Sequence, residues 1–170
     1  MMAKKKRRGS LFERARLSRL AAVQAFYQMI LREQSSGVVI AEFMNLRFSS
    51  EEYTIQPDPV LFQKLVSGAE ERGAEILNVI QASLNKDWQY ERLECVLKAI
   101  LYIASAELLN RLTDVPAPVI ITEYVDITRS FYAGKETAFV NGYLDRLARH
   151  LGYAMSRQEG NPEIKEDNLV

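Results

Sequence analysis

The sequence predicts an all-α protein, a compact helical bundle, from three observations. Only five of its 170 residues are proline, and the stretches 60–115 and 119–161 contain none, so long helices are permitted there. Apolar residues make up 48% of the chain and charged residues 26%, which is typical of a globular domain with a buried core. Apolar side chains also recur at helical spacing along most of the chain.

Six helices are expected, at about 11–34, 39–47, 59–85, 90–112, 118–133 and 136–151. The first continues until Gly37 interrupts its apolar pattern. The third begins at Asp58-Pro59, because Asp58 can cap the first backbone N–H groups and Pro59 suits the first helical position. Gly68 and Gly73 within it argue against one straight rod.

The last three helices follow from an apolar stripe and from clear breaks. The helix at about 90–112 has apolar side chains at nearly every third and fourth position, as expected of a central core helix. Pro116 and Pro118 force a turn after it, because a proline pushes the preceding residue out of the α region. Gly134 ends the next helix, and Gly152 is the expected C-cap of the last.

The chain is expected to form one helical domain between two tails. The boundaries are a disordered basic arm at 1–10, a domain at 11–153 with subdomains at about 11–85 and 90–153, and an acidic flexible tail at 154–170. The single cysteine, Cys95, cannot form an internal disulfide, and no run of about 18 apolar residues occurs. We therefore expect a cytoplasmic protein that does not enter a membrane.

The sequence lacks the usual signs of an enzyme. It has no glycine-rich phosphate-binding loop. Its one histidine, His150, supplies too few ligands for most metal sites built from histidines. Adjacent carboxylates such as Glu70 and Glu71 point about 100° apart on a helix, which suits a solvated face better than acid/base chemistry. We expect no catalytic residue, metal or cofactor.

The net charge of zero hides an uneven distribution. Residues 1–19 carry +7, residues 20–156 carry −5, and residues 157–170 carry −2. A basic end on an acidic body is typical of an arm that binds a polyanion, with an affinity that falls as salt is added. A basic N-terminus alone is also consistent with a solubilising tail or, at Lys4–Arg8, with a nuclear-import signal.

The basic start supplies the first candidate RNA contacts, beginning with Arg8 in the arm. Arg16 and Arg19 are three residues apart, so they lie on one face of the first helix, whereas Arg14 points elsewhere. Tyr27 follows on the same helix and offers a ring for stacking. Packing in the core is the alternative for Tyr27.

A second candidate surface lies on the last helix. Phe139, Tyr143, Arg146 and His150 recur at spacings of four, three and four, which places them in one stripe. Aromatic rings beside basic groups suit stacking on unpaired bases while the phosphates are neutralised. The alternative is that Phe139 and Tyr143 only widen the buried face.

Four segments resemble, in order, the NusB family of transcription antitermination factors. They are Ala22-Val23-Gln24-Ala25-Phe26-Tyr27, Leu101-Tyr102-Ile103-Ala104-Ser105-Ala106-Glu107-Leu108, Val115-Pro116 with Ile121-Thr122-Glu123-Tyr124-Val125, and Phe139-Val140-Asn141-Gly142-Tyr143-Leu144-Asp145-Arg146. The resemblance extends over about 14–149. It implies two packed three-helix subdomains and a non-enzymatic protein that binds boxA RNA of ribosomal leader transcripts. It also implies as partners the ribosomal protein NusE and the RNA polymerase antitermination complex.

By position, the resemblance places Arg16, Arg19 and Phe139 on or beside RNA-contacting positions of the family, and Arg146 at a site that is usually basic. We therefore expect the basic segment and Phe139 to converge in one groove for an unpaired strand.

Three positions depart from the family pattern. Tyr102 stands where a basic residue is usual, Ala106 replaces a common tyrosine, and Lys135 lies in a loop that is usually acidic.

Two other functions remain open. One is a protein-interaction module that binds no RNA, possibly a homodimer, and the other is an accessory RNA-binding domain similar to that of some ribosomal RNA methyltransferases.

Overall fold

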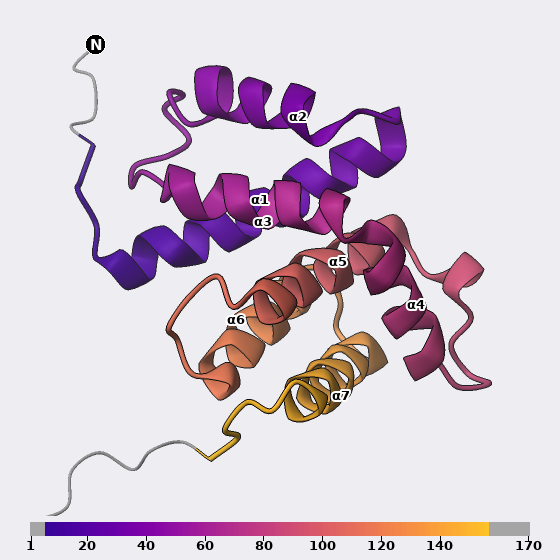
Figure 1. Cartoon of the computed structure of the whole chain (residues 1–170). Helices are drawn as coiled ribbons and strands as arrows, with labels where there is room; N and C mark the ends of the chain where they lie inside the picture. Colours follow the sequence, from indigo (N-terminus) through magenta and orange to yellow (C-terminus); the bar gives the residue numbers. More distant parts are fainter. Residues whose placement is uncertain (1–5, 157–170) are drawn as a thin grey trace, which may run out of the picture.

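A computed structural model describes residues 6–156 and confirms the all-α class (Figure 1). The elements are α1 (Leu11–Arg32), α2 (Ser36–Glu42), the π-helical turn η1 (Phe43–Arg47), α3 (Pro59–Glu71), α4 (Gly73–Ser83), the 3₁₀ turn η2 (Tyr90–Arg92), α5 (Cys95–Asn110), α6 (Ala117–Phe131) and α7 (Lys135–His150). Between residues 6 and 156 the extended pairing is limited to an isolated bridge of Arg7 with Ile55. No helix in this part is long and apolar enough to cross a membrane.

Side-chain caps fix the starts of two long helices. At α1, the Ser10 hydroxyl accepts a hydrogen bond from the Glu13 N–H at 3.1 Å, and the Glu13 carboxylate accepts from the Ser10 N–H at 2.7 Å. At α3, Asp58 Oδ1 accepts from the N–H groups of Val60 and Leu61. The cap at Asp58 is the one that the sequence predicts. Both caps satisfy donors that would otherwise lack partners at a helix start.

The expected single helix at 59–85 is wrong, because the chain turns at Arg72 and continues as α4. Arg72 leaves helical geometry at φ −99° and ψ 17°. Its guanidinium donates to Asn110 Oδ1 of α5 at 3.0 Å and to the Glu75 carboxylate of α4. These bonds hold the corner, and α4 packs against both α3 and α5. The described part therefore has seven α-helices rather than six.

Helix α5 is the centre of the core, as its apolar stripe predicts. It packs against α1, α3, α4, α6 and α7. Every residue from 101 to 108 on it is buried, which requires neighbours on all sides of the helix. Figure 1 shows α1, α2 and α3 on one side of α5, and α6 and α7 on the other.

The first described residues lie against the body of the protein. The Arg7 N–H donates to the Thr54 carbonyl at 2.9 Å, and Lys6 Nζ donates to the Phe48 carbonyl at 3.1 Å. The expected disorder of the arm therefore does not hold for residues 6–10. Residues 1–5 of the predicted arm and 157–170 of the predicted tail lie outside the described residues.

Candidate nucleic-acid interface

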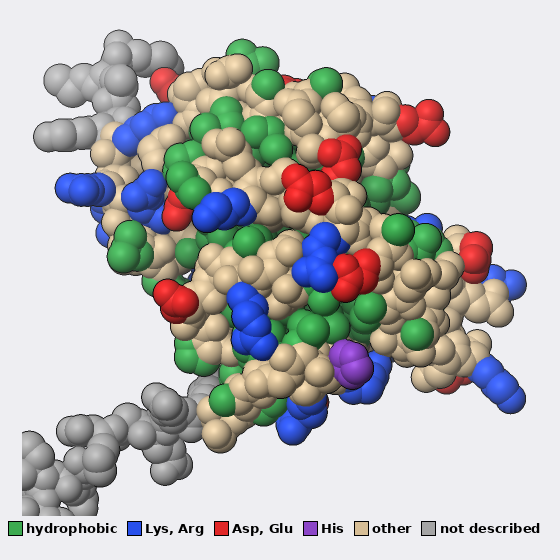
Figure 2. Space-filling view, in the orientation of Figure 1, with side chains coloured by type: hydrophobic (Ala, Val, Ile, Leu, Met, Phe, Trp, Pro, Cys, Tyr) green, Lys and Arg blue, Asp and Glu red, His purple; other side chains and the backbone are tan. Residues whose placement is uncertain are grey.

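Basic side chains gather around the N-terminal segment and the start of α1. Lys6, Arg7 and Arg8 are exposed, and Figure 2 shows Lys and Arg side chains close to this end of the molecule. Arg7 forms an ion pair with Glu13, the residue that caps α1. The backbone bonds of the segment hold these cations on the surface of the folded domain rather than beyond it.

Arg14 and Arg16 continue this basic surface, but both have protein partners. The half-buried Arg14 donates to the carbonyl of Gln56 at 3.1 Å, which fixes the loop before α3. Arg16 has a side chain that is 51% exposed, and it pairs with Asp126 at 3.1 Å and with the buried Glu123 at 3.4 Å. A ligand phosphate that binds Arg16 therefore competes with carboxylates of α6.

Arg19 does not belong to this surface, which corrects the expectation from the sequence. It is 1% exposed, and its guanidinium makes hydrogen bonds of 2.8 and 2.9 Å to the two carboxylate oxygens of Glu107. Tyr124 and Thr113 also donate to Glu107, at 2.6 and 3.0 Å. Burial acts to lower the pKa of Arg19, but the bonds and the charge of Glu107 outweigh it and raise that pKa.

The sequence does contain a signal for the burial of Arg19. Arg19, Ala22 and Phe26 follow each other at helical spacing, so Arg19 extends the stripe by which α1 packs on the core. Glu107 is an acidic residue inside the most apolar helix, where a charge needs a partner. Tyr27 lies beside this stripe and is half-buried against the core.

An aromatic stack lies at the N-terminal end of α7. The ring of Phe139 stacks on the indole of Trp88, with centroids 4.4 Å apart and planes 23° apart. Lys135, one turn earlier on α7, holds its ammonium 5.2 Å from the centroid of the same indole. Phe139 remains partly exposed. The sequence analysis missed Trp88, although a lone tryptophan in a polar loop is itself a signal for a partner surface.

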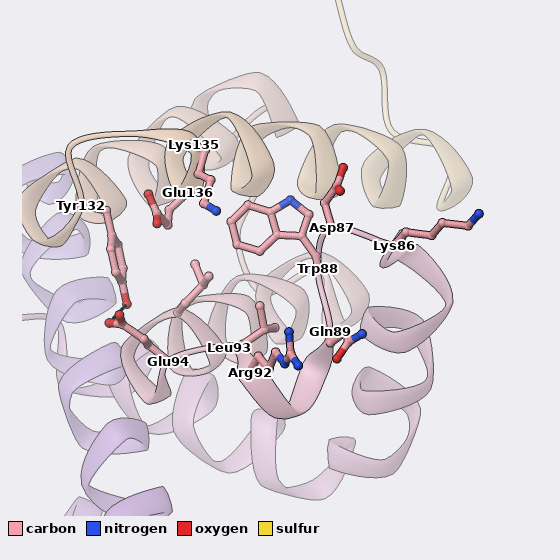
Figure 3. A pocket seen from close by; sticks show the side chains of 11 residues that line it. Lys86, Asp87, Trp88, Gln89, Arg92, Leu93, Glu94, Tyr132, Lys135 and Glu136 are labelled. Atoms are coloured by element: carbon pink, nitrogen blue, oxygen red, sulfur yellow. Dashed lines mark hydrogen bonds between the residues drawn. The ribbon is translucent and has the colours of Figure 1, made fainter.

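A pocket of about 280 Å³ opens beside this stack (Figure 3). Trp88 forms one side of it, below α7, and the Lys135 ammonium lies next to the indole. On the other side, the Tyr132 hydroxyl donates to the Glu94 carboxylate at 3.1 Å. Burial and this bond raise the pKa of Tyr132 to about 12. The pocket thus combines an aromatic wall with groups of both charges.

The predicted stripe along α7 divides between core and surface. Tyr143 is 1% exposed, and its hydroxyl is hydrogen-bonded to that of Ser105 at 2.8 Å. For Tyr143, the alternative of a wider buried face is therefore correct. Arg146 and His150 are exposed on the outside of α7.

The expected single groove is wrong. The N-terminal segment and the loop between α4 and α5, which carries Trp88, lie at opposite sides of the molecule (Figure 1). Phe139 lies at the Trp88 side, so it does not face the cations around Arg8 and Arg16. An RNA strand that contacts both surfaces must therefore run along the length of the helical bundle.

The fold and these surfaces define a helical binding protein. Within residues 6–156, no group of three or more His, Cys, Asp or Glu side chains is arranged to hold a metal ion. The model of the NusB family matches residues 16–149. The chain belongs to this family, whose members are antitermination factors and not enzymes, and the resemblance seen in the sequence is confirmed.

Curated relatives support this assignment. The transcription antitermination protein NusB of Maricaulis maris is 40% identical over 138 residues, which cover 79% of this chain and 85% of the relative. The protein of the same name from Caulobacter vibrioides is 38% identical over 144 residues, or 83% and 96% of the two chains.

Solved structures share the fold. T. maritima NusB matches with a TM-score of 0.66 and 26% identity, over 84% of this chain and 93% of its own. NusB from a crystal structure of the antitermination factors NusB and NusE in complex with double-stranded RNA also matches with a TM-score of 0.66. That match covers 82% of this chain and 99% of the other at 23% identity, so it supports the fold alone.

Proposed function

We propose that this protein binds boxA-type single-stranded RNA of ribosomal leader transcripts together with NusE, and so joins the antitermination complex of RNA polymerase. The observation that carries the proposal is the family match over residues 16–149. A related fold has been solved together with NusE and double-stranded RNA, which supports these two kinds of partner.

Phosphate binding is assigned to the basic start of the chain. Arg8 is exposed and Arg16 is half-exposed, so both guanidinium groups can reach a phosphate. Arg14 supports them by fixing the neighbouring loop. Asp126 holds Arg16 in place. A phosphate replaces Asp126 at low cost, because an exposed ion pair contributes only about 0–1 kcal/mol.

Base stacking is assigned to the surface around Phe139. Phe139 and Trp88 stack face to face, so each ring covers one face of the other. A base that extends this stack on a free ring face contributes about 1–3 kcal/mol. Lys135 provides a cation within reach of the adjoining phosphate. Arg146 extends this surface along α7, and the half-buried Tyr27 is the remaining proposed contact.

A titration of the full chain tests the proposal. Labelled boxA RNA and a scrambled RNA of equal length are compared at two salt concentrations, with and without NusE. We expect boxA to bind more tightly than the scrambled RNA, more weakly at high salt, and more tightly when NusE is present. Equal affinity for the two RNAs under all four conditions would contradict the proposal. A homodimer without RNA affinity would instead favour the protein-interaction module.

A further inference from the structure

One carboxylate bridges two arginines where α1 meets α6. Asp126 Oδ2 accepts a hydrogen bond from Arg16 Nη2 of α1 at 3.1 Å, and its Oδ1 accepts one from Arg129 Nη1 of α6 at 2.8 Å. The two guanidinium groups thus point at a single anion from two different helices. Guanidinium groups that converge in this way also suit a phosphate, whose free oxygens accept several hydrogen bonds at once.

Asp126 is the replaceable member of this cluster. Its side chain is 32% exposed, and an ion pair in contact with water contributes little to stability. A phosphodiester carries one negative charge on two free oxygens, as a carboxylate does. It can therefore take the place of Asp126 between Arg16 and Arg129.

Glu123 keeps Arg16 in position when Asp126 is replaced. Its carboxylate is 4% exposed, and its Oε2 lies 3.4 Å from Arg16 Nε. Within residues 6–156 this oxygen makes no hydrogen bond, so Arg16 is the cation beside a buried charge. Removing the cation from a buried carboxylate costs far more than breaking an exposed pair. Arg16 therefore stays on Glu123 through Nε, and Nη2 changes its partner.

Arg129 lies between the two proposed RNA surfaces. Asp126, Arg129 and Tyr132 follow each other at intervals of three residues, so each step is about 4.5 Å along the helix axis. Asp126 contacts the basic start of α1 through Arg16, and Tyr132 lines the pocket beside Trp88. Figure 1 shows α6 running across the molecule from the side where α1 begins towards the start of α7. A cation at Arg129 thus supports an RNA strand that contacts both surfaces.

We propose that Arg16 and Arg129 form a phosphate clamp for single-stranded RNA, which Asp126 closes while RNA is absent. The phosphate displaces Asp126, both guanidinium groups donate to it, and Glu123 is the positioning residue for Arg16. The charges of these four side chains cancel in the closed clamp, so Asp126 lowers the affinity for RNA. The clamp rests on the proposed function and adds to it one contact residue, Arg129, and one inhibitory residue, Asp126.

Arg129→Gln tests the clamp in the full chain. Binding of boxA RNA and of a scrambled RNA should both weaken by about three- to fivefold, as expected for one exposed ion pair, because phosphate contacts carry no sequence information. Arg149→Gln is the matched control, since Arg149 is also 62% exposed and also pairs with an aspartate of its own helix, Asp145. Equal effects of the two variants would overturn the clamp.

Asp126→Asn should have the opposite effect. It removes the charge that competes with the phosphate, so both RNAs should bind about three- to fivefold more tightly. The matched control is Asp145→Asn, which makes the same change of net charge at the pair with Arg149. When Arg16 and Arg129 are both replaced by Gln, Asp126→Asn should increase the affinity no more than Asp145→Asn does. A larger gain that persists without both arginines would contradict the inhibitory role.

The positioning role of Glu123 is tested by a double-mutant cycle. Glu123→Gln should weaken RNA binding when Arg16 is present and have little effect in an Arg16→Gln background, once unfolding curves have shown that the variants are folded. The same loss in both backgrounds would mean that Glu123 does not act through Arg16.

The two RNAs separate the clamp from the proposed function. If boxA binds no more tightly than the scrambled RNA but the variants shift both affinities as expected, the boxA function fails and the clamp stands. If boxA is preferred and Arg129→Gln changes nothing, the clamp fails and the proposed function stands. Binding of neither RNA refutes both.

Discussion

Arg19 of α1 and Glu107 of α5 form an ion pair in which both side chains are buried away from water. The two side chains are 1% and 0% exposed, and they are joined by hydrogen bonds through both carboxylate oxygens. Tyr124 and Thr113 complete the shell of donors around Glu107. The ion pair joins α1 to α5 through two residues that are 88 positions apart in the sequence.

Replacing Arg19 with alanine should destabilise the protein strongly. The substitution leaves Glu107 charged and buried without its cation, which typically costs about 3–5 kcal/mol. Urea unfolding of the two proteins measures the difference. Arg149→Ala is the matched control, because both members of its ion pair with Asp145 are exposed and the variant should lose at most about 1 kcal/mol. A similar small loss in both variants would mean that the buried pair does not stabilise the fold.

The stability of the protein should fall as the pH rises from about 10 to about 12. Burial raises the pKa of Tyr143 to about 12, against a smaller opposing effect of the Ser105 hydrogen bond. The unfolded chain therefore loses this proton at lower pH than the folded chain, so the contribution is complete below about pH 10 and is lost above it. The loss from this group is about 2–3 kcal/mol.

Tyr143→Phe provides the test of this pH effect. The variant has no hydroxyl to ionise, so its free energy of unfolding should fall less steeply between about pH 9 and about pH 12. Urea unfolding at several pH values gives both curves. Burial also raises the pKa of Tyr124, so some decline should remain. Parallel curves for the two proteins would rule out Tyr143 as a source of the effect.

Phe139→Ala should weaken binding of boxA RNA by about 1–3 kcal/mol, because one base loses its stacking partner. Trp88→Ala should also weaken binding, since Trp88 holds the Phe139 ring in place by stacking on it. Fluorescence anisotropy with labelled RNA measures both, after unfolding curves have shown that the variants are folded. Phe131→Ala is the control, as its ring is 46% exposed and lies outside the stack. Unchanged affinity in folded Phe139→Ala would exclude the stacking role.

Arg8→Gln should reduce the dependence of RNA binding on salt. One phosphate contact fewer lowers the slope of log K against log salt by about 0.7 for a single strand. The slope is obtained from titrations at four or more salt concentrations. Arg149→Gln is a charge-matched control, because Arg149 is exposed and pairs with Asp145 at the far end of α7. If both variants change the slope equally, the effect comes from overall charge rather than from a contact at Arg8.

Most of the helices follow from local patterns in the sequence. The spacing of apolar residues and the breaks at proline and glycine place α1, α5, α6 and α7 within a few residues of their observed bounds. The cap at Asp58 follows from residue type alone. The corner at Arg72 does not, because its bond to Asn110 of α5 exists only after the two helices have packed.

The candidate surface was less predictable than the helices. Arg8, Arg16 and Phe139 are at least partly exposed, as their proposed role requires, but Trp88 was missed and Arg19 was assigned wrongly. Periodicity states which residues share a face, yet it does not state which face meets another helix.

By itself, the sequence determined the helical class, the family, and the concentration of positive charge at one end of the chain. Each of these depends on residue type and short-range spacing, which are present before folding. Tertiary structure decided that Arg19 pairs with Glu107 rather than with a ligand, that Tyr143 lies in the core, and that Trp88 stacks on Phe139. The physical reason is that burial and pairing depend on partners distant in sequence, and packing alone brings them within contact.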